Sequence, residues 1–162
     1  MSSQVLRDQQ SASLEVWVRL LRAHAIARRA VSVRLQGEHG LTINDYEALL
    51  LLHRSEGHAL RRVDLAEGLS LTASGVTRLL EGLERQGLVD KATCETDARV
   101  TYAVLTEGGR RKLVEAGEPH VAAVRGLFEE RFNDDELVLL AELLARLPGP
   151  PVGDASECTV QD

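Results

Sequence analysis

The spacing of hydrophobic residues predicts a long helix near the start of the chain and a shorter helix after it. No Pro or Gly interrupts residues 12–36. Gly37 and Gly40 predict the end of that helix, and residues 42–45 form a cap for the second helix, which ends near Gly57. Apolar residues of the first helix recur at intervals of three, four and seven, which is the repeat of one helix face; they are Leu14, Trp17, Leu21, Val31 and Leu35.

Two short helices and a hairpin are predicted for the middle of the chain. The segment 60–68 forms the first short helix. The second begins at Thr72 and stops at Gly87, because glycine readily adopts the left-handed end of a helix. Residues 88–89 and 100–105 are short β-type segments on either side of a polar loop, which predicts a two-stranded hairpin. The residues expected to face inward are Val63, Ala66 and Leu69, then Val76, Leu79, Leu80 and Leu83.

The C-terminal third predicts two more helices. Thr106 caps a long one, which Pro119 must either kink or divide because proline removes a backbone donor and clashes with the preceding turn. Residues 133–136 form a carboxylate-rich cap for the last helix. We expect residues 148–162, which hold three of the four prolines, to be disordered. The apolar residues of the two helices are Leu113, Val121, Val124 and Phe128, then Leu137, Leu140, Leu144 and Leu147.

Composition restricts the class of protein. A chain of 162 residues with 44% hydrophobic residues is long and apolar enough to bury a core, and 3% aromatic residues favour helices over a β-sandwich. No apolar run is long enough to span a bilayer and the polar N-terminus lacks a signal core, so we expect a cytoplasmic protein without a membrane partner. Two cysteines, Cys94 and Cys158, are too few for a disulfide scaffold.

Charge is distributed unevenly along the chain. The net charge is −6, but residues 113–162 hold 3 Lys/Arg against 11 Asp/Glu, whereas residues 60–112 hold 9 against 8. The excess acid therefore lies in the C-terminal third. A local basic surface on the middle third is allowed, although the total charge gives it no positive support.

A helix, a tight turn, a second helix and a hairpin follow one another in the order of a winged helix-turn-helix. The face that the second helix leaves outside begins with hydroxyl side chains, a glycine and Arg78, which suit the edges of bases in a major groove. Glu81 and Glu84 would repel phosphate, so contact should end near Arg78. Arg99 at the hairpin tip can enter a minor groove, and Asp97 can orient it. An ordinary solvated helix followed by a surface hairpin is the alternative reading.

The same stretch resembles the MarR family of bacterial transcriptional regulators. About residues 12–147 follow the family's order of elements. The matching motifs are Leu41-Thr42, residues 46–50, Asp64-Leu65-Ala66, residues 74–80 and 83–89, Asp97-Ala98-Arg99 and residues 105–109.

The resemblance implies a homodimer whose terminal helices interlock and which carries two winged domains onto palindromic double-stranded DNA. Ala98 departs from the second Arg that many members have there. We therefore expect a mainly α fold with dimerisation helices at 1–40 and 107–147, a winged DNA-binding domain at 41–106 and a tail at 148–162. The expected function is transcription regulation, most simply as a repressor. The predicted DNA-binding residues are Arg62, Thr72, Ser74, Gly75, Thr77, Arg78, Asp97 and Arg99.

Dimerisation has its own argument from the sequence. The outer helices carry more apolar surface than a small winged domain covers, and an isologous helical interface would bury it. A monomer that folds its end helices onto its own core is the alternative. The residues concerned are Leu14, Trp17 and Val18 at one end and Leu137, Leu140, Leu143, Leu144 and Leu147 at the other.

MarR-like proteins often hold an anionic phenolic ligand between the dimer helices and the winged domain. Here Trp17, His24 and Arg28 share one face of the first helix, and Tyr46 and His53 of the second could face them. Arginine and histidine among aromatic walls suit a carboxylate or phenolate. Each residue also has a structural interpretation: Arg28 as half of an ion pair across the dimer, His24 as a core imidazole, Trp17 as packing.

We expect no cofactor, no metal and no catalysis, although two other readings stay open. Glu38 and His39 resemble the placement of ligands in zinc-sensing relatives, and His120 follows later, but no second His lies one turn from it to close a four-ligand site. The chain also lacks a phosphate loop, a nucleophile elbow and a His-Glu-x-x-His motif. The competing class is a winged-helix interaction module without DNA binding, which a steep salt dependence of duplex binding would exclude.

Overall fold

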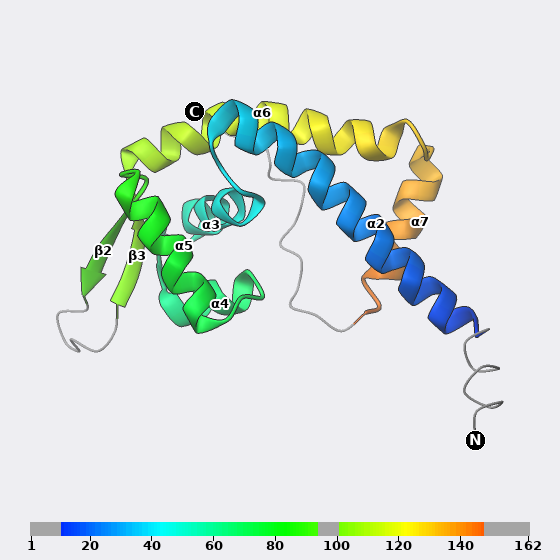
Figure 1. The fold of residues 1–162 in the computed structure, drawn as a ribbon, viewed down its shortest axis with the longest axis horizontal. Helices are drawn as coiled ribbons and strands as arrows, with labels where there is room; N and C mark the ends of the chain where they lie inside the picture. The colour runs from blue at the N-terminus through cyan, green and yellow to red at the C-terminus, as the bar shows by residue number, and fades with distance from the viewer. Residues whose placement is uncertain (1–10, 94–100, 148–162) are drawn as a thin grey trace, which may run out of the picture.

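The computed structural model describes residues 11–93 and 101–147, and the fold is mainly helical with one small sheet (Figure 1). Two long helices, α2 (Ala12–Arg34) and α6 (Glu107–Glu129), lead away from residues 41–106, which we call the winged region. Predictions for the start of the chain, for the tail, and for Asp97 and Arg99 fall outside the described residues. In chain order the elements are α2 (Ala12–Arg34), η1 (Leu35–His39), α3 (Ile43–Arg54), η2 (Glu56–His58), β1 (Ala59–Arg61), α4 (Arg62–Gly68), α5 (Ala73–Arg85), β2 (Val89–Thr93), β3 (Thr101–Leu105), α6 (Glu107–Glu129) and α7 (Asp134–Leu144).

The first helix is confirmed, and Gly40 is the one of the two predicted glycines that ends it. Ser11 caps α2 by accepting a hydrogen bond from the Leu14 amide at 3.3 Å. The helix does not stop at Gly37: it continues as the π-helical turn η1, and Gly40, with φ 68°, ends it. A left-handed φ costs glycine little, so Gly40 and not Gly37 makes the turn into the next helix.

The second helix begins at its predicted cap. Thr42 and Asp45 form a capping box, in which Thr42 Oγ1 accepts from the Asp45 amide at 3.1 Å and Asp45 Oδ2 accepts from the Thr42 amide at 2.8 Å. This satisfies two amides that the helix itself leaves unpaired. One face of α3 is buried, including Tyr46, Leu49 and Leu52. Helix α3 is therefore the central helix of the core.

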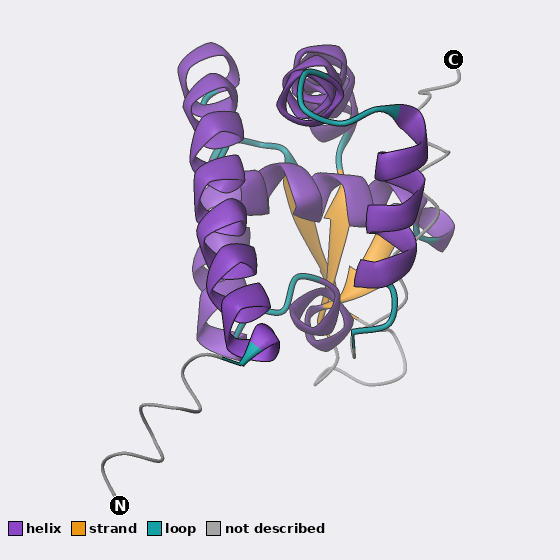
Figure 2. Ribbon diagram, turned by 90° about the vertical axis from the view of Figure 1, so that its right-hand side faces the viewer, coloured by secondary structure: helices purple, strands orange, loops and turns teal. Residues whose placement is uncertain are grey.

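The sheet has three strands, so the prediction of a two-stranded hairpin is incomplete. The strand order is β1-β3-β2, and both pairings are antiparallel. In β2 and β3, Val89 pairs with Leu105 and Thr93 with Thr101, which confirms the hairpin strands. The added strand β1 pairs Ala59 with Val104. With three residues, β1 is too short to show an alternating pattern. The strands lie side by side among the helices (Figure 2).

The two short helices are confirmed, with one error in their inward faces. Ala66 and Leu69 pack against the core as predicted, but Val63 is 57% exposed. Leu65, with no exposed surface, takes the inward position in α4. Two residues of an α-helix are about 200° of rotation, so Val63 must point away from the side that Leu65 faces. In α5, Val76, Leu80 and Leu83 are buried as predicted, and Leu79 is half-buried.

The C-terminal helices begin at their predicted caps. Thr106 Oγ1 accepts from the Gly109 amide at 2.9 Å, and Asn133 forms a capping box with Glu136. Helix α6 runs through Pro119 without a break, so the alternative that proline divides it is wrong. No residue of α7 is buried in the described chain. None of the helices in the described ranges is long and apolar enough to cross a membrane.

Candidate nucleic-acid interface

The N-terminus of α5 presents two hydroxyl groups. Thr72 caps the helix, and its Oγ1 accepts a hydrogen bond from the Gly75 amide at 3.1 Å. The Ser74 Oγ lies 3.2 Å from the Thr72 Oγ1, and both side chains are exposed. Each hydroxyl can donate or accept. The first turn of α5 therefore offers adaptable hydrogen-bonding groups at the end of a helix whose dipole favours anions.

The outermost line of α5 is formed by Ser74, Arg78, Glu81 and Arg85, all of them exposed. These residues lie opposite the buried side of the helix because each residue advances it by about 100°. The guanidinium groups of Arg78 and Arg85 therefore point away from the core. Arg78 lies one turn after Ser74, and Arg85 lies three turns after it. Arg85 was not predicted as a site residue. Its seven-residue spacing from Arg78 was the available signal.

Thr77 lies on the flank of α5 and not on that outer line. Its side chain is half-buried, and its Oγ1 donates to the carbonyl oxygen of Ala73 at 2.9 Å. Thr77 Oγ1 also accepts a hydrogen bond from Arg62 Nη2 at 2.9 Å. Two predicted DNA-binding residues, Arg62 at the start of α4 and Thr77 in α5, are thus in direct contact.

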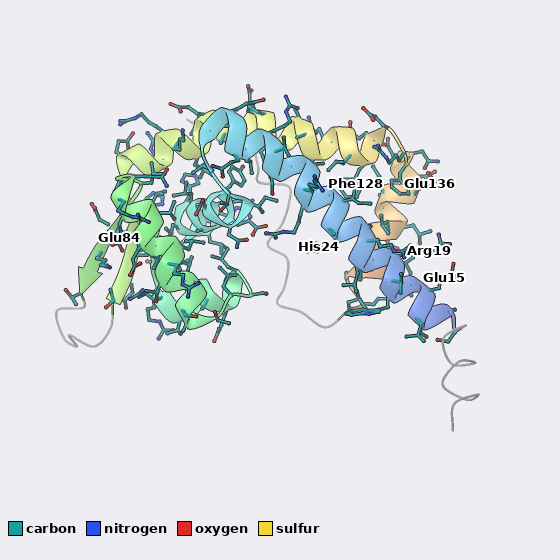
Figure 3. All side chains as sticks on the ribbon, viewed as in Figure 1. Glu15, Arg19, His24, Glu84, Phe128 and Glu136 are labelled. Carbon is teal, nitrogen blue, oxygen red and sulfur yellow. The ribbon has the colours of Figure 1, made fainter. Side chains whose placement is uncertain are left out.

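Glu84 lies seven residues after Thr77 on the same flank, where it meets the wing. Its Oε2 is 2.8 Å from Lys91 Nζ in β2, and Figure 3 shows Glu84 projecting from α5. The expectation that Glu84 repels phosphate and ends the contact at Arg78 needs correction, because its carboxylate is paired with a cation and turned from the outer face. Of the two acids, only Glu81 remains beside Arg78 and Arg85.

A second acid of this region is also paired internally. Arg61 donates two hydrogen bonds of 2.7 Å to the two carboxylate oxygens of Asp64. These bonds lower the pKa of the Asp64 carboxyl below its usual range. They also raise the pKa of the Arg61 guanidinium above its usual range. Within the described part of the winged region, Arg62, Arg78 and Arg85 form no ion pair with a carboxylate. Cations can therefore gather on this surface although residues 60–112 are nearly neutral overall.

Comparisons with known proteins identify the family. A family model described as MarR family matches residues 39–100. The chain is 32% identical to AbsC, a MarR family transcriptional regulator from Streptomyces coelicolor, over 83% of this chain and 90% of that one, with a TM-score of 0.75. The chain belongs to the MarR family.

Two further solved structures are informative about this MarR-family protein. Sco3205, a MarR family regulator from Streptomyces coelicolor solved in complex with DNA, is 27% identical with a TM-score of 0.77, covering 82% of each chain. CouR from Rhodococcus jostii RHA1, solved bound to p-coumaroyl-CoA, is 27% identical with a TM-score of 0.68, covering 83% of this chain and 92% of CouR. Together with the family model, these matches identify a winged-helix, DNA-binding transcriptional regulator.

Three of the residues predicted to bind a ligand have different surroundings in this MarR-family chain; they are Trp17, Tyr46 and His53. Trp17 is 56% exposed and lies in the second turn of α2. The Tyr46 ring packs against His120 of α6, with centroids 4.3 Å apart. The His53 ring is stacked on His58 at 5.4 Å. Burial lowers the pKa of His53, with the nearby cations acting in the same direction.

His24 and Arg28 meet a carboxylate that the sequence analysis did not single out. Arg28 Nη2 donates to Asn44 Oδ1 of α3 at 3.0 Å. Burial raises the pKa of the neighbouring Glu47 carboxyl, and Arg28 and then His24 act against that rise. A bound anion would have to compete with Glu47 for these cations. The anionic pocket remains a prediction.

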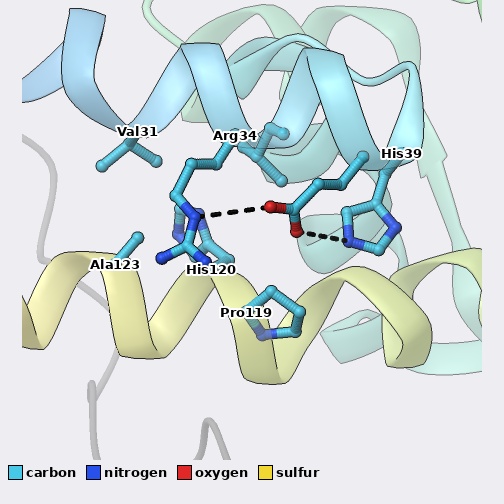
Figure 4. Close-up of a pocket in the computed structure, with 8 residues that line it drawn as sticks. Val31, Arg34, His39, Pro119, His120 and Ala123 are labelled. Atoms are coloured by element: carbon cyan, nitrogen blue, oxygen red, sulfur yellow. Dashed lines mark ion pairs between the residues drawn. The ribbon is translucent and has the colours of Figure 1, made fainter.

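The three weak metal candidates line one narrow crevice between η1 and α6 (Figure 4). Glu38 Oε1 is 3.5 Å from Arg34 Nε, and its Oε2 is 4.0 Å from His39 Nε2. His39 Nε2 and His120 Nδ1 make no hydrogen bond to the described residues. Burial lowers the pKa of His120. Within residues 11–93 and 101–147 no group of three or more His, Cys, Asp or Glu is arranged to hold a metal ion.

Proposed function

We propose that this MarR-family regulator is a homodimeric repressor that occupies a palindromic operator. The observation that carries the dimer is the exposed apolar surface of α2 and α7, which we call the arms. Large hydrophobic side chains exposed on them are Leu14, Val16, Trp17, Val18, Leu21, Ile26 and Val33 on α2, with Val138, Leu139, Leu143 and Leu144 on α7.

The extent of this exposed apolar surface supports association with a second copy of the chain. Soluble monomers rarely expose contiguous apolar patches of more than a few hundred Å². Helix α7 and the first part of α2 lie at the end of the molecule away from the wing strands (Figure 1), and they stand apart on opposite sides of that end (Figure 2). A helix of 23 residues is about 35 Å long, which gives an interface of useful length. A second copy with the same surface would bury both.

The two α5 helices of such a dimer, one from each chain, would contact DNA symmetrically. Successive major grooves on one side of a duplex are about 34 Å apart, so a two-fold dimer reads half-sites about one turn apart. Binding in the cytoplasm at a promoter palindrome excludes other proteins from the same duplex, which is the physical basis of repression. This proposal includes the predicted domains. Residues 1–40 and 107–147 form the dimerisation helices, and residues 41–106 form the DNA-binding domain.

The mass of the protein in solution tests the dimer. The double variant Leu139→Glu with Leu143→Glu places two carboxylates on the exposed face of α7. We expect the wild-type chain to have the mass of two chains by light scattering, and the variant that of one. Val63→Glu is the matched control, because Val63 is 57% exposed but lies outside the arms, and it should remain a dimer. A monomeric wild-type protein, or a dimeric α7 variant, would contradict the proposal.

The effector is the second part of the proposal: a small anionic or phenolic molecule releases the repressor from DNA. Support comes from Arg28 and His24 beside α3, and from the relative CouR, which was solved with an acyl-CoA ligand. The probes are 4-hydroxybenzoate and p-coumaroyl-CoA, with benzylamine as a cationic comparison. We expect an anionic probe to weaken duplex binding, and Arg28→Ala to remove that response without changing affinity in its absence. Equal affinity with and without each anion would refute the effector.

A further inference from the structure

Arg62 and Thr77 form a continuous hydrogen-bonded chain that joins α4 to α5. Arg62 Nη2 donates to Thr77 Oγ1 at 2.9 Å, and the Thr77 hydroxyl donates onward to the Ala73 carbonyl at 2.9 Å. Arg62 stands at the first position of α4, and Thr77 lies in the second turn of α5. The contact therefore holds a guanidinium from one helix against the N-terminal half of the other.

We propose that Thr77 is a positioning residue that orients Arg62, and that Arg62 determines specificity by reading a guanine edge in the major groove. The inference rests on the DNA-binding function and adds to it the residue that recognises a base. The expected partner is guanine because its O6 and N7 acceptors match the paired donors of a guanidinium.

The constraint on Arg62 favours a base contact over a phosphate contact. Its side chain is half-buried, whereas its neighbour Arg61 is exposed. The bond to Thr77 occupies one of the five N–H donors of the guanidinium, and no carboxylate of the described residues pairs with it. A planar fork that is already oriented loses little freedom when it binds a planar partner. Arg61 has the opposite arrangement, because Asp64 takes two of its donors.

The Thr77 hydroxyl has no proton left to donate to a base. Its proton is directed to Ala73, and it accepts from Arg62. The Thr77→Val substitution removes these two hydrogen bonds and keeps the shape of the side chain, so a change of sequence preference in that variant would act through Arg62. This differs from Ser74, whose hydroxyl is exposed and lies next to another adaptable hydroxyl.

Selection of duplexes from a random pool, followed by salt titration of the best site, tests the proposal. Arg62→Ala should flatten the preference for guanine at one symmetric position in each half-site, by about tenfold or more. Arg62→Lys should also lose that preference while keeping the charge. Thr77→Val should weaken it with little change in salt dependence, because the hydroxyl is lost and the shape kept. Thr77→Ser, which keeps the hydroxyl, should retain it.

Arg61→Ala is the matched control, because it removes the same charge from the adjacent position. It should leave the base preference unchanged, and thermal unfolding checks that each variant is folded. If Arg62→Ala lowers affinity equally for all duplexes and reduces the salt slope by about one, Arg62 contacts phosphate and the inference is wrong. A Thr77→Val profile identical to wild type overturns the positioning role. If the wild-type protein itself enriches no sequence, the proposed function fails and not this inference alone.

Discussion

The winged region and the arms of this protein differ in how far they bury their apolar side chains. In the described chain, every buried hydrophobic residue lies between Val31 and Ala116. Helix α7 buries none, and Trp17 and Ile26 of α2 are 56% and 68% exposed. The winged region therefore closes its core with the end of α2, with η1 and with the first half of α6, whereas α7 and the first part of α2 leave their apolar side chains exposed. The difference indicates that folding and assembly depend on separate sets of residues.

The largest expected effect is at the point where α6 enters the core of the winged region. A Cβ on Gly109 would overlap the Leu88 carbonyl oxygen and lie 2.7 Å from Leu105 Cδ1. The obstructing atoms include backbone, which cannot move aside. We expect Gly109→Ala to lower the free energy of unfolding by more than about 4 kcal/mol, measured by urea denaturation.

Gly82→Ala is the control for that substitution. Gly82 is also within a helix, but no atom lies within 4 Å of its added Cβ. Alanine there should raise stability by about 1 kcal/mol through helix propensity. Equal stabilities for the Gly109 and Gly82 variants would show that the close approach of α6 to Leu88 does not exist.

A pair of leucine truncations compares the two regions directly. Leu52 of α3 has no exposed surface, and Leu143 of α7 is 45% exposed. Leu52→Ala should cost about 2–5 kcal/mol of unfolding free energy, because it leaves a cavity in a closed core. Leu143→Ala should instead weaken association, seen as a larger dissociation constant on dilution in light scattering. A Leu143→Ala variant that unfolds as easily as Leu52→Ala would remove the distinction between the regions.

The third prediction concerns the surface that the winged region turns to DNA. Arg78→Ala should reduce affinity for the selected duplex by about tenfold and lower the salt slope by about one, since one fewer phosphate counterion is released. Arg85→Ala should act in the same direction, and less strongly because Arg85 lies two turns farther from the N-terminal end of α5 that faces the groove. Arg125→Ala, an exposed arginine of α6, should have no effect. Equal losses for Arg125 and Arg78 would mean that net charge alone controls binding.

The smallest effect is expected where the two regions meet, at His120. Burial lowers its pKa in the folded chain, so the unfolded chain takes up a proton first as pH falls. Stability is then full above the ordinary histidine pKa of about 6.5 and decreases as pH falls from there toward the folded pKa. His120→Phe keeps a ring against Tyr46 and should flatten the fall in melting temperature between pH 7 and pH 5. An unchanged slope would exclude His120 as a contributor.

Most of the helices could be predicted because local signals determine their starts. The caps at Thr42, Thr72, Thr106 and Asn133 are all confirmed, and each is a short polar side chain just before an apolar repeat. Strand β1 was missed because its partner, β3, lies more than 40 residues away in the chain. Such a pairing leaves no local pattern. Proline at position 119 predicts a kink or a break, but α6 continues through it.

The sequence predicted which types of residue form the site better than it predicted how those residues are arranged. The outward position of Arg78 follows from helix periodicity, and so would that of Arg85. The pairing of Glu84 with Lys91 and the contact of Arg62 with Thr77 depend on how α4, α5 and β2 pack, which periodicity within one element does not determine. The same holds for Glu47, whose burial beside Arg28 and His24 depends on how α2 crosses α3.

Selection of bound duplexes from a random pool at two salt concentrations is the decisive test of operator binding by a dimer, because it reports DNA binding, symmetry and specificity together. We expect an enriched palindrome with half-sites about 10 base pairs apart, bound by one dimer with an affinity that falls steeply as salt rises. No enriched sequence at either salt concentration, or an asymmetric site bound by a single chain, would contradict it.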